Sequence, residues 1–464
     1  MIADMNISGI ATPSTQLAHL SRAWHLADCL IGGTAAMRAA GRAYLPQWPA
    51  EDDDAYQWRK DTATLFPAYR RTLAVMAGKP FSRQLTVNEA GAEMQALLDD
   101  IDREGSSLHV FAQRLMHEAL AFGICGVLVD YTRRPDGVGN IRAQEKAAGM
   151  RPYLVFVRHH EILGWRAERV NGRYRLTQLR LLETATIPDG DYGEKTIRRV
   201  RLLEPGRWAL FEEPAGAHAQ WTQIDGGDTV GMPEIPFVPF YGRKRGFMAG
   251  EPPLADLAWL NVKHWQSQSD QDTILHVARV PILVVAGAED GAPLRVGAST
   301  AVRLPQGGAM HFVEHSGAAI SAGAAALDAL EQQMIQTGAE LLMKQPGSRT
   351  ATESSNDAEA NKSELLAIVE NFEDSLDQCL QLMADWMQTG EGGKVSLFKE
   401  FGAGSLSEVS AQLVLSMQGA GLISRETAIR EQQRRGLLSP DIEPAAELEK
   451  AAEDGPALGK VGTE

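Results

Sequence analysis

One segment, GEPPLADLAWLNVKHWQSQSDQDTILHVA (residues 250–278), sets the class of this protein. Its prolines stand at the start, where a helix tolerates them, and residues 251–278 contain no glycine. This pattern predicts one helix of about seven turns. The middle of that helix, from His264 to Asp272, is polar nearly all round, so we expect it to face solvent or neighbouring subunits rather than the core of one chain.

The segment that follows predicts a small β element between two helices. Residues 279–317 alternate short apolar runs with glycine and proline turns, which is typical of short strands. Helical periodicity returns from Ser321 onward. The apolar residues that share one face of this second helix are Leu327, Leu330, Met334, Ile335, Leu341 and Leu342.

A broken loop and a long acidic helix come next. The loop KQPGSRTAT (344–352) contains a Pro-Gly pair that ends the second helix. Residues 353–388 then run without proline or glycine, and at about 1.5 Å per residue they predict a helix on the order of 50 Å long. Its apolar stripe consists of Leu365, Ile368, Val369, Phe372, Leu376, Cys379, Leu380, Met383 and Trp386.

The last part of the chain predicts two shorter helices, over residues 405–418 and from Ser424. An acidic, alanine-rich tail follows Pro440, and we expect it to be disordered near its end.

The part of the chain before residue 250 predicts an α+β unit. Apolar residues recur at three- and four-residue steps over 108–122, behind the capping serines Ser106 and Ser107, as in a capped amphipathic helix. The runs ICGVLVDY (124–131) and YLVFVR (153–158) have strand composition, and Asn171-Gly172 suits a two-residue hairpin turn. We interpret residues 124–241 as one antiparallel meander packed with the N-terminal helices.

Composition limits the functions open to this chain of 464 residues. Its 60 acidic residues outnumber its 45 basic ones, and the net charge of -15 argues against a conventional basic DNA-clamping protein. Cys29, Cys125 and Cys379 show no CxxC spacing, so we interpret them as buried free thiols. Because no signal-peptide pattern and no run of 18 apolar residues occur, we expect neither secretion nor a membrane span.

The motif that most resembles a catalytic metal-binding sequence is His311-Phe312-Val313-Glu314-His315, which has the H-x-x-E-H order of inverted zinc proteases. Zinc would need both histidines on one face of a helix, but Gly307, Gly308 and Gly317 flank the motif in strand-like sequence. Residues four apart in a strand lie roughly 13 Å from each other, too far to share a metal. The motif therefore predicts no metal site.

Other short motifs also have ordinary explanations. Gly392-Gly393-Lys394 lacks the Ser or Thr that a phosphate-binding loop requires next, and His117-Glu118 lacks a second histidine one turn on. His159-His160-Glu161 follows a strand, where a surface turn is expected. We predict no catalytic residue, no metal and no cofactor. The triplet Arg243-Lys244-Arg245 stands at a domain boundary, where it meets phosphate, another subunit or simply solvent.

This order of elements resembles the portal proteins of tailed bacteriophages. Several stretches look like a phage family once described only as a domain of unknown function. They are ALAFGICGVLVDY (119–131), IPFVPFYG (235–242), PPLADLAWLNVKHWQSQSD (252–270) and ATESSNDAEANKSELLAIVENFEDSLDQCLQLMADW (351–386).

The resemblance implies an α+β, portal-like fold, with an α/β wing, two stem helices flanking a small β-containing clip, a long helix and a short helical crown. The implied segments are a wing over 1–251, stem helices over 252–278 and 318–343, a clip over 279–317, a channel loop over 344–352, a long wing helix over 353–390, and a crown with an acidic tail over 391–464.

The resemblance also implies where contacts lie. Lys344 and Arg349 of the channel loop are candidates for contact with DNA phosphates, although surface solubility explains them equally well. The clip would dock partners, and its candidate residues are Glu289, Asp290, Arg295 and Arg303.

The implied function is a structural one. A ring of about twelve copies at one capsid vertex, the head–tail junction of the virion, would pass double-stranded DNA without reading its sequence during packaging and ejection. The implied partners are the large terminase, a head-completion or tail adaptor, the major capsid protein and scaffold, with assembly in the host cytoplasm and no membrane. Two alternatives stay open: a ring-forming connector or minor capsid protein elsewhere in the particle, and a phage-encoded metal-dependent hydrolase.

Overall fold

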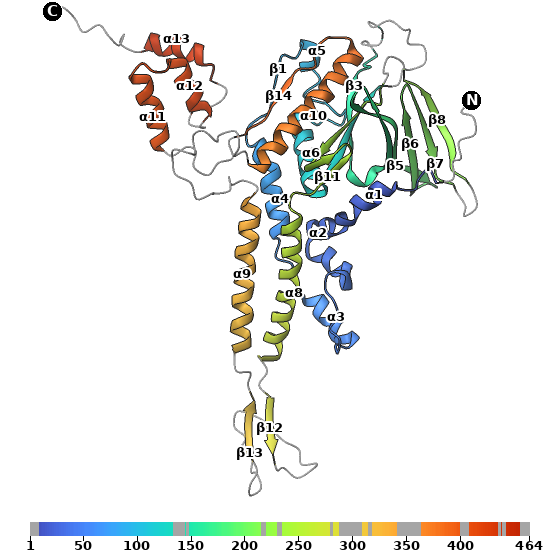
Figure 1. Ribbon diagram of the computed structural model, residues 1–464, viewed down its shortest axis with the longest axis vertical. Coiled ribbons are helices and arrows are strands. Elements are labelled where there is room, and N and C mark those ends of the chain that lie inside the picture. Colours follow the sequence, from blue (N-terminus) through green and yellow to red (C-terminus); the bar gives the residue numbers. More distant parts are fainter. Residues whose placement is uncertain are drawn as a thin grey trace, which may run out of the picture. The chain divides into compact units, whose positions relative to one another are not determined.

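The computed structural model describes residues 9–132, 144, 148–214, 220–229, 234–278, 282–286, 309–313, 318–340, 363–399, 408–434, 438 and 442–454. The chain divides into two compact units, Met1–Lys399 and Glu400–Glu464. The first mixes helices with several antiparallel sheets, so the predicted α+β class is confirmed (Figure 1).

Helices make up most of the N-terminal part of the first unit. The predicted helix behind Ser107 is present as α6 (Leu108–Phe122); the Ser107 hydroxyl caps it by accepting from the Val110 amide, and left-handed Gly123 ends it. The other helices here are α1 (Thr15–Leu20), α2 (Trp24–Ala40), α3 (Asp53–Thr62), α4 (Ala68–Gly78) and α5 (Ala92–Gln95).

Two separate sheets occupy the region in which we predicted one meander, so that prediction is wrong. In the first, β2 (Ile124–Tyr131) lies between β3 (Pro152–Val157) and β9 (Phe237–Tyr241). The physical reason is burial. Six consecutive residues of β2 are buried, and apolar β9 returns across the sequence to cover its free edge.

The second sheet is a five-stranded meander whose strands follow one another in sequence. It contains β4 (Ile162–Val170), β5 (Arg173–Asp189), β6 (Gly193–Glu204), β7 (Arg207–Glu212) and β8 (Thr222–Asp228). Asn171 and Gly172 join β4 to β5 with φ angles of 50° and 82°, which confirms the predicted two-residue turn.

Three two-stranded sheets complete the first unit. They pair β1 (Thr86–Asn88) with β14 (Lys394–Ser396), β10 (Arg243–Gly246) with β11 (Ala249–Glu251), and β12 (Ile282–Ala286) with β13 (Ala309–Val313). The β12–β13 pair is the predicted β element between two helices. None of the helices in the described residues is both long and apolar enough to cross a membrane.

Gly126 marks the tightest packing in the three-stranded sheet. A Cβ atom at this position would lie 2.1 Å from the Phe237 ring, which covers it from β9. We expect Gly126→Ala to lower the free energy of unfolding by about 1–3 kcal/mol, because a buried ring has no free space to move into. Gly78→Ala is the control, since nothing lies within 4 Å of its added Cβ. A urea titration that gave both variants the same midpoint would contradict this account.

The helix predicted from the opening segment is α8 (Ala255–Ala278), and α9 (Ala318–Glu340) runs beside it (Figure 1). Small residues of α9 allow this helix to lie close to α8 and α4. A Cβ at Gly323 would lie 2.0 Å from the Gln271 side-chain oxygen of α8, and one at Gly338 would lie 3.0 Å from Thr72 of α4. Leu327, Leu330 and Met334 are buried as predicted, whereas Ile335 is 64% exposed, which corrects that assignment; Leu341 and Leu342 lie outside the described residues.

The expectation that the polar middle of α8 avoids the core is wrong. Asn261, His264 and Ser269 are buried because α2, α3 and α4, as well as α9, pack against α8. Buried polar groups need partners, and Asn261 has two: its amide donates to the Phe66 carbonyl at 2.9 Å and its oxygen accepts from the Tyr69 amide at 3.0 Å.

The long acidic helix is α10 (Glu364–Met387), and it packs on the three-stranded sheet. Residues 353–362 lie outside the described part of the chain. The predicted stripe is buried from Leu365 to Met383, while Trp386 is half-buried and stacks on Tyr131 with ring centroids 5.0 Å apart.

The second unit contains three described helices, which contact one another in chain order. They are α11 (Glu408–Gly419), α12 (Arg425–Arg434) and α13 (Pro444–Asp454). The first two were predicted. The third, which was not predicted, lies in the acidic, alanine-rich tail; its proline stands at the first helical position, and strong helix formers follow. The end of the tail, where we expected disorder, lies outside the described residues.

Candidate functional site

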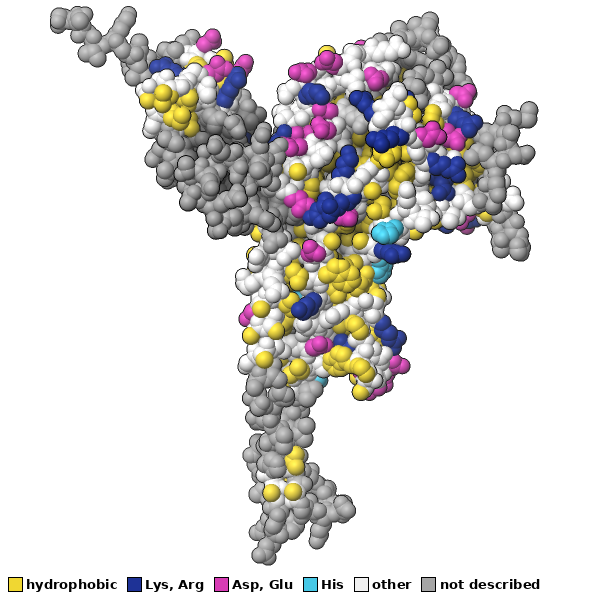
Figure 2. Space-filling model, in the orientation of Figure 1, with side chains coloured by type: hydrophobic (Ala, Val, Ile, Leu, Met, Phe, Trp, Pro, Cys, Tyr) yellow, Lys and Arg dark blue, Asp and Glu magenta, His cyan; other side chains and the backbone are white. Residues whose placement is uncertain are grey.

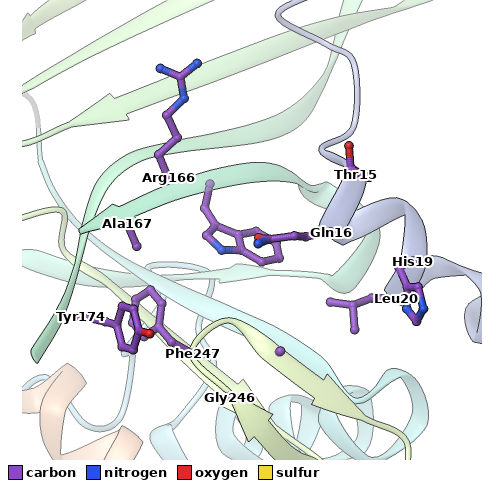
Figure 3. Close-up of a pocket in the computed structure, with 11 residues that line it drawn as sticks. Thr15, Gln16, His19, Leu20, Arg166, Ala167, Tyr174, Gly246 and Phe247 are labelled. Atoms are coloured by element: carbon purple, nitrogen blue, oxygen red, sulfur yellow. The ribbon is translucent and has the colours of Figure 1, made fainter. Parts of the chain in front are cut away.

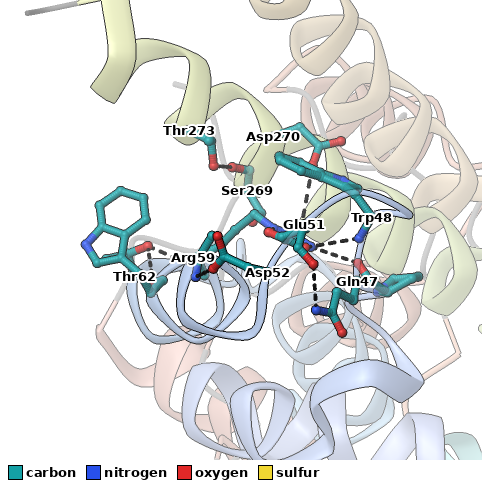
Figure 4. A network of polar contacts seen from close by, with 12 residues as sticks. Gln47, Trp48, Glu51, Asp52, Arg59, Thr62, Ser269, Asp270 and Thr273 are labelled. Atoms are coloured by element: carbon teal, nitrogen blue, oxygen red, sulfur yellow. Dashed lines mark hydrogen bonds and ion pairs between the residues drawn. The ribbon is translucent and has the colours of Figure 1, made fainter.

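A buried ion pair connects α3 to the pair of long helices. Arg59 donates from Nε and Nη2 to the two oxygens of Glu51, each at 2.7 Å, and both side chains are almost fully buried. The guanidinium lies 4.3 Å from the centroid of the Trp48 ring and 3.9 Å from Asp270 on α8. Figure 4 shows Glu51 and Arg59 at the centre of these contacts. No motif or spacing in the sequence predicted this network.

The hydrogen bonds from Arg59 hold the pKa of Glu51 below its ordinary value of 4.5, against the opposing effect of burial. A carboxyl with a depressed folded pKa contributes stability that is complete above about pH 4.5 and is lost as the pH falls through the lower folded value. Each pH unit of depression corresponds to about 1.4 kcal/mol.

We therefore expect the melting temperature of the native chain to fall steeply below about pH 4.5, and the fall to be shallower in Glu51→Gln. Asp53→Asn is the matched control, because Asp53 pairs with Arg42 at the surface, where it is 81% exposed. The measurement is melting temperature against pH from 7 to 3. Identical slopes for native and Glu51→Gln proteins would show that Glu51 does not titrate as described.

The outward faces of α8 and α9 carry large apolar side chains that nothing in the described residues covers. Trp259 is 62% exposed on α8, with exposed Lys263 one turn away. Ile335 is 64% exposed on α9, which also carries exposed Asp328. Figure 2 shows hydrophobic side chains gathered over α8 and the helices beside it. We call these two the stem faces.

A groove of about 850 Å³ lies between α1, the start of the five-stranded sheet and the β10–β11 pair. The rings of Tyr174 and Phe247, which both line the groove, stack with centroids 5.4 Å apart. Figure 3 shows this pair and the Arg166 side chain extending away from it. The residues that line the groove include the titratable side chains of His19 and Tyr174 but no carboxylate.

Glu118 and the His159–Glu161 turn form the one cluster of potential metal ligands found among the described residues. His159 Nδ1 lies 2.6 Å from the Glu118 carboxylate. The surface turn predicted here is only partly correct: His160 is exposed, but His159 is 4% exposed because the Phe122 and Trp24 rings cover it. The sequence analysis missed this cluster because 41 residues separate Glu118 from His159.

The basic triplet has partners within the chain. Arg243 forms a bidentate ion pair with Glu364 in the first turn of α10, and Arg245 pairs with Glu251 at 2.7 Å. Lys244 Nζ lies 5.2 Å from the centroid of the Tyr241 ring. Both arginines keep part of their surface exposed, so contact with phosphate or a neighbouring subunit stays a prediction.

The other predicted contact residues lie outside the described part of the chain: Glu289, Asp290, Arg295, Arg303, Lys344 and Arg349. The H-x-x-E-H motif is described only in part. His311 stands on β13, which confirms the predicted strand, whereas Glu314 and His315 lie outside the described residues.

Comparison with known proteins gives one family match. A family model described as "Domain of unknown function (DUF4055)" matches residues 253–387, which run from α8 to the end of α10. No curated protein matches the chain.

Among solved structures, chains from gene transfer agent particles are similar. A chain from the virion of the native particle is 14% identical with a TM-score of 0.41, over 87% of this chain and 98% of that one. A chain from the neck of the native particle, computed with C12 symmetry, is 13% identical with a TM-score of 0.41, over 87% and 99%. Likeness at this level is too weak to transfer either fold or function to the present chain.

Proposed function

We propose that this chain is a portal subunit, one copy of a ring that conducts double-stranded DNA into and out of a phage capsid. The observation that carries the proposal is the succession α8, β12–β13, α9 and α10, in which two long neighbouring helices are joined through a two-stranded sheet. In this proposal α8 and α9 are the stem, β12–β13 belongs to the clip and α10 is the long wing helix.

The stem faces support a ring rather than a monomer. Large exposed apolar side chains on helices are favourable only if a partner covers them. The occupant we propose is a second copy of this chain, because Trp259 and Lys263 on α8 complement Ile335 and Asp328 on α9 in charge as well as in apolarity. Contact between two different faces of identical chains is heterologous, and such contacts form a ring when the rotation from one copy to the next closes.

The chemistry of the chain supports a conduit rather than a motor. A net charge of -15 keeps the average field repulsive to phosphate, which favours passage over tight binding. We propose that a separate terminase supplies the packaging energy. Terminase and the head–tail adaptors would dock on the clip, Lys344 and Arg349 would touch DNA transiently, and the ring would occupy a capsid vertex at the head–tail junction.

Negative-stain electron microscopy of the purified full chain, with its mass measured in solution, tests this proposal. We expect rings with a central hole and about twelve copies. Reconstitution of procapsids distinguishes a portal from another connector, because only a portal would be required before DNA enters. A chain that stays monomeric at high concentration, and with capsid protein and scaffold present, would overturn the proposal.

A further inference from the structure

A second site lies in the first unit, away from the stem faces. Glu118 projects from α6, and His159 and His160 belong to the turn that joins β3 to β4. One potential ligand atom from each of the three residues lies within 4.8 Å of the other two. The His159 and His160 rings have centroids 4.8 Å apart and stand nearly perpendicular, at 82°.

We infer that Glu118, His159 and His160 bind a divalent transition-metal ion of the zinc class. Two imidazoles and one carboxylate form a donor set that suits zinc, and a fourth position is left for water. Zinc–ligand bonds of about 2.0–2.2 Å place tetrahedral donors roughly 3.4 Å apart. The three ligand atoms lie within 4.8 Å of one another, and we expect the exposed His160 side chain to rotate so that they reach this spacing.

Neighbouring aromatic rings restrict the orientation of the His159 imidazole. The Phe122 ring stacks on it with centroids 3.5 Å apart, and Trp24 meets it edge-on at 4.7 Å. His159 Nδ1 lies 2.6 Å from the Glu118 carboxylate, within hydrogen-bond distance. A metal ion bound here would replace that hydrogen bond, with Nδ1 and the carboxylate as two of its ligands.

Neighbouring groups are compatible with a bound cation. His160 is exposed, so an ion can reach its imidazole from solvent. Asp28 of α2 also faces the cluster, since both histidines and Glu118 act on its charge. A metal held here would join α6 to the β3–β4 turn, and this role does not depend on the proposed portal function.

Zinc content after equilibration tests the site. The untagged full-length chain would be stripped with chelator, mixed with equimolar zinc, desalted and measured by mass spectrometry of the metal. We expect about one zinc per chain, and at least about tenfold weaker binding in Glu118→Gln and His160→Ala. His160→Ala is the decisive variant for zinc binding, because the His160 ring is exposed and we expect its removal not to impair folding. His117→Ala, next to the site, is the control.

Cobalt substitution gives a second readout. We expect visible cobalt absorption in the native chain and in His117→Ala, and its loss in His160→Ala. Cys29, Cys125 and Cys379 are free thiols, so X-ray absorption must show nitrogen and oxygen ligands only. Sulfur ligation, no zinc in the native chain, or equal binding by native and His160→Ala proteins would each overturn the inference. None of these results bears on ring formation.

Discussion

The variant Trp259→Glu should purify as a folded monomer under conditions in which the native chain forms rings. Trp259 is 62% exposed on α8, so its replacement removes little from the core of a single chain. Buried tryptophans at the centre of interfaces commonly contribute about 2–4 kcal/mol, and the lower value corresponds to about 30-fold in affinity. A carboxylate in the same place adds the penalty of burying a charge.

Ring closure multiplies this effect, because every subunit carries the same substitution and every interface is weakened. Tyr192→Glu is the matched control: Tyr192 is a fully exposed aromatic residue in the β5–β6 turn, away from the stem faces. Sedimentation velocity on the three proteins separates the outcomes. Rings of native size in Trp259→Glu would show that α8 does not form the contact between copies, whether or not the chain is a portal.

Arg59→Met should lower the free energy of unfolding by about 3–5 kcal/mol, the largest loss of stability expected from a single change in this chain. The substitution keeps the volume but leaves Glu51 buried without its guanidinium partner. Glu51 would then take up a proton more readily, so the loss should shrink as the pH falls and should be smallest below the depressed pKa of Glu51 in the native chain, where both proteins carry a neutral carboxyl.

Two further variants identify the source of the loss. Arg42→Met breaks an ion pair between exposed side chains, which is worth at most about 1 kcal/mol. The double variant Arg59→Met/Glu51→Leu removes both buried charges and should recover most of the stability lost in the single variant. Trp48, 4.3 Å from the guanidinium, provides a local fluorescence signal for unfolding. A double variant no more stable than Arg59→Met would exclude an unpaired charge as the cause.

Local signals in the sequence were sufficient for most single elements. The capping serine before α6, the Asn-Gly turn between β4 and β5 and the apolar stripe of α10 each act through neighbouring residues, and each prediction was confirmed. The predictions that were wrong concerned residues whose surroundings are formed by segments far away in the sequence. His264 and Ser269 are buried because α2, α3, α4 and α9 pack against α8, and β9 leaves the predicted meander because it pairs with the second edge of β2.

The candidate sites also depend on contacts between residues that are far apart in the sequence. Prolines at its start and the absence of glycine predicted the helix α8, but its environment was predicted from polarity alone, which did not reveal Trp259 as a surface residue. Glu118 and His159 are 41 positions apart, and neither residue is unusual where it stands in the sequence. Tertiary packing creates that pair, as it does the ion pair of Arg59 and Glu51.

The small residues of α9 also bear on the width of the proposed channel. Gly323 and Gly338 let α9 lie close against Gln271 of α8 and Thr72 of α4, so each copy is thin where its stem would stand in the ring. In a closed ring of about twelve copies, widening each copy by about 1 Å lengthens the circumference by about 12 Å and the diameter by about 4 Å. A larger side chain at either glycine would therefore widen the proposed channel and the gap between its wall and the DNA duplex.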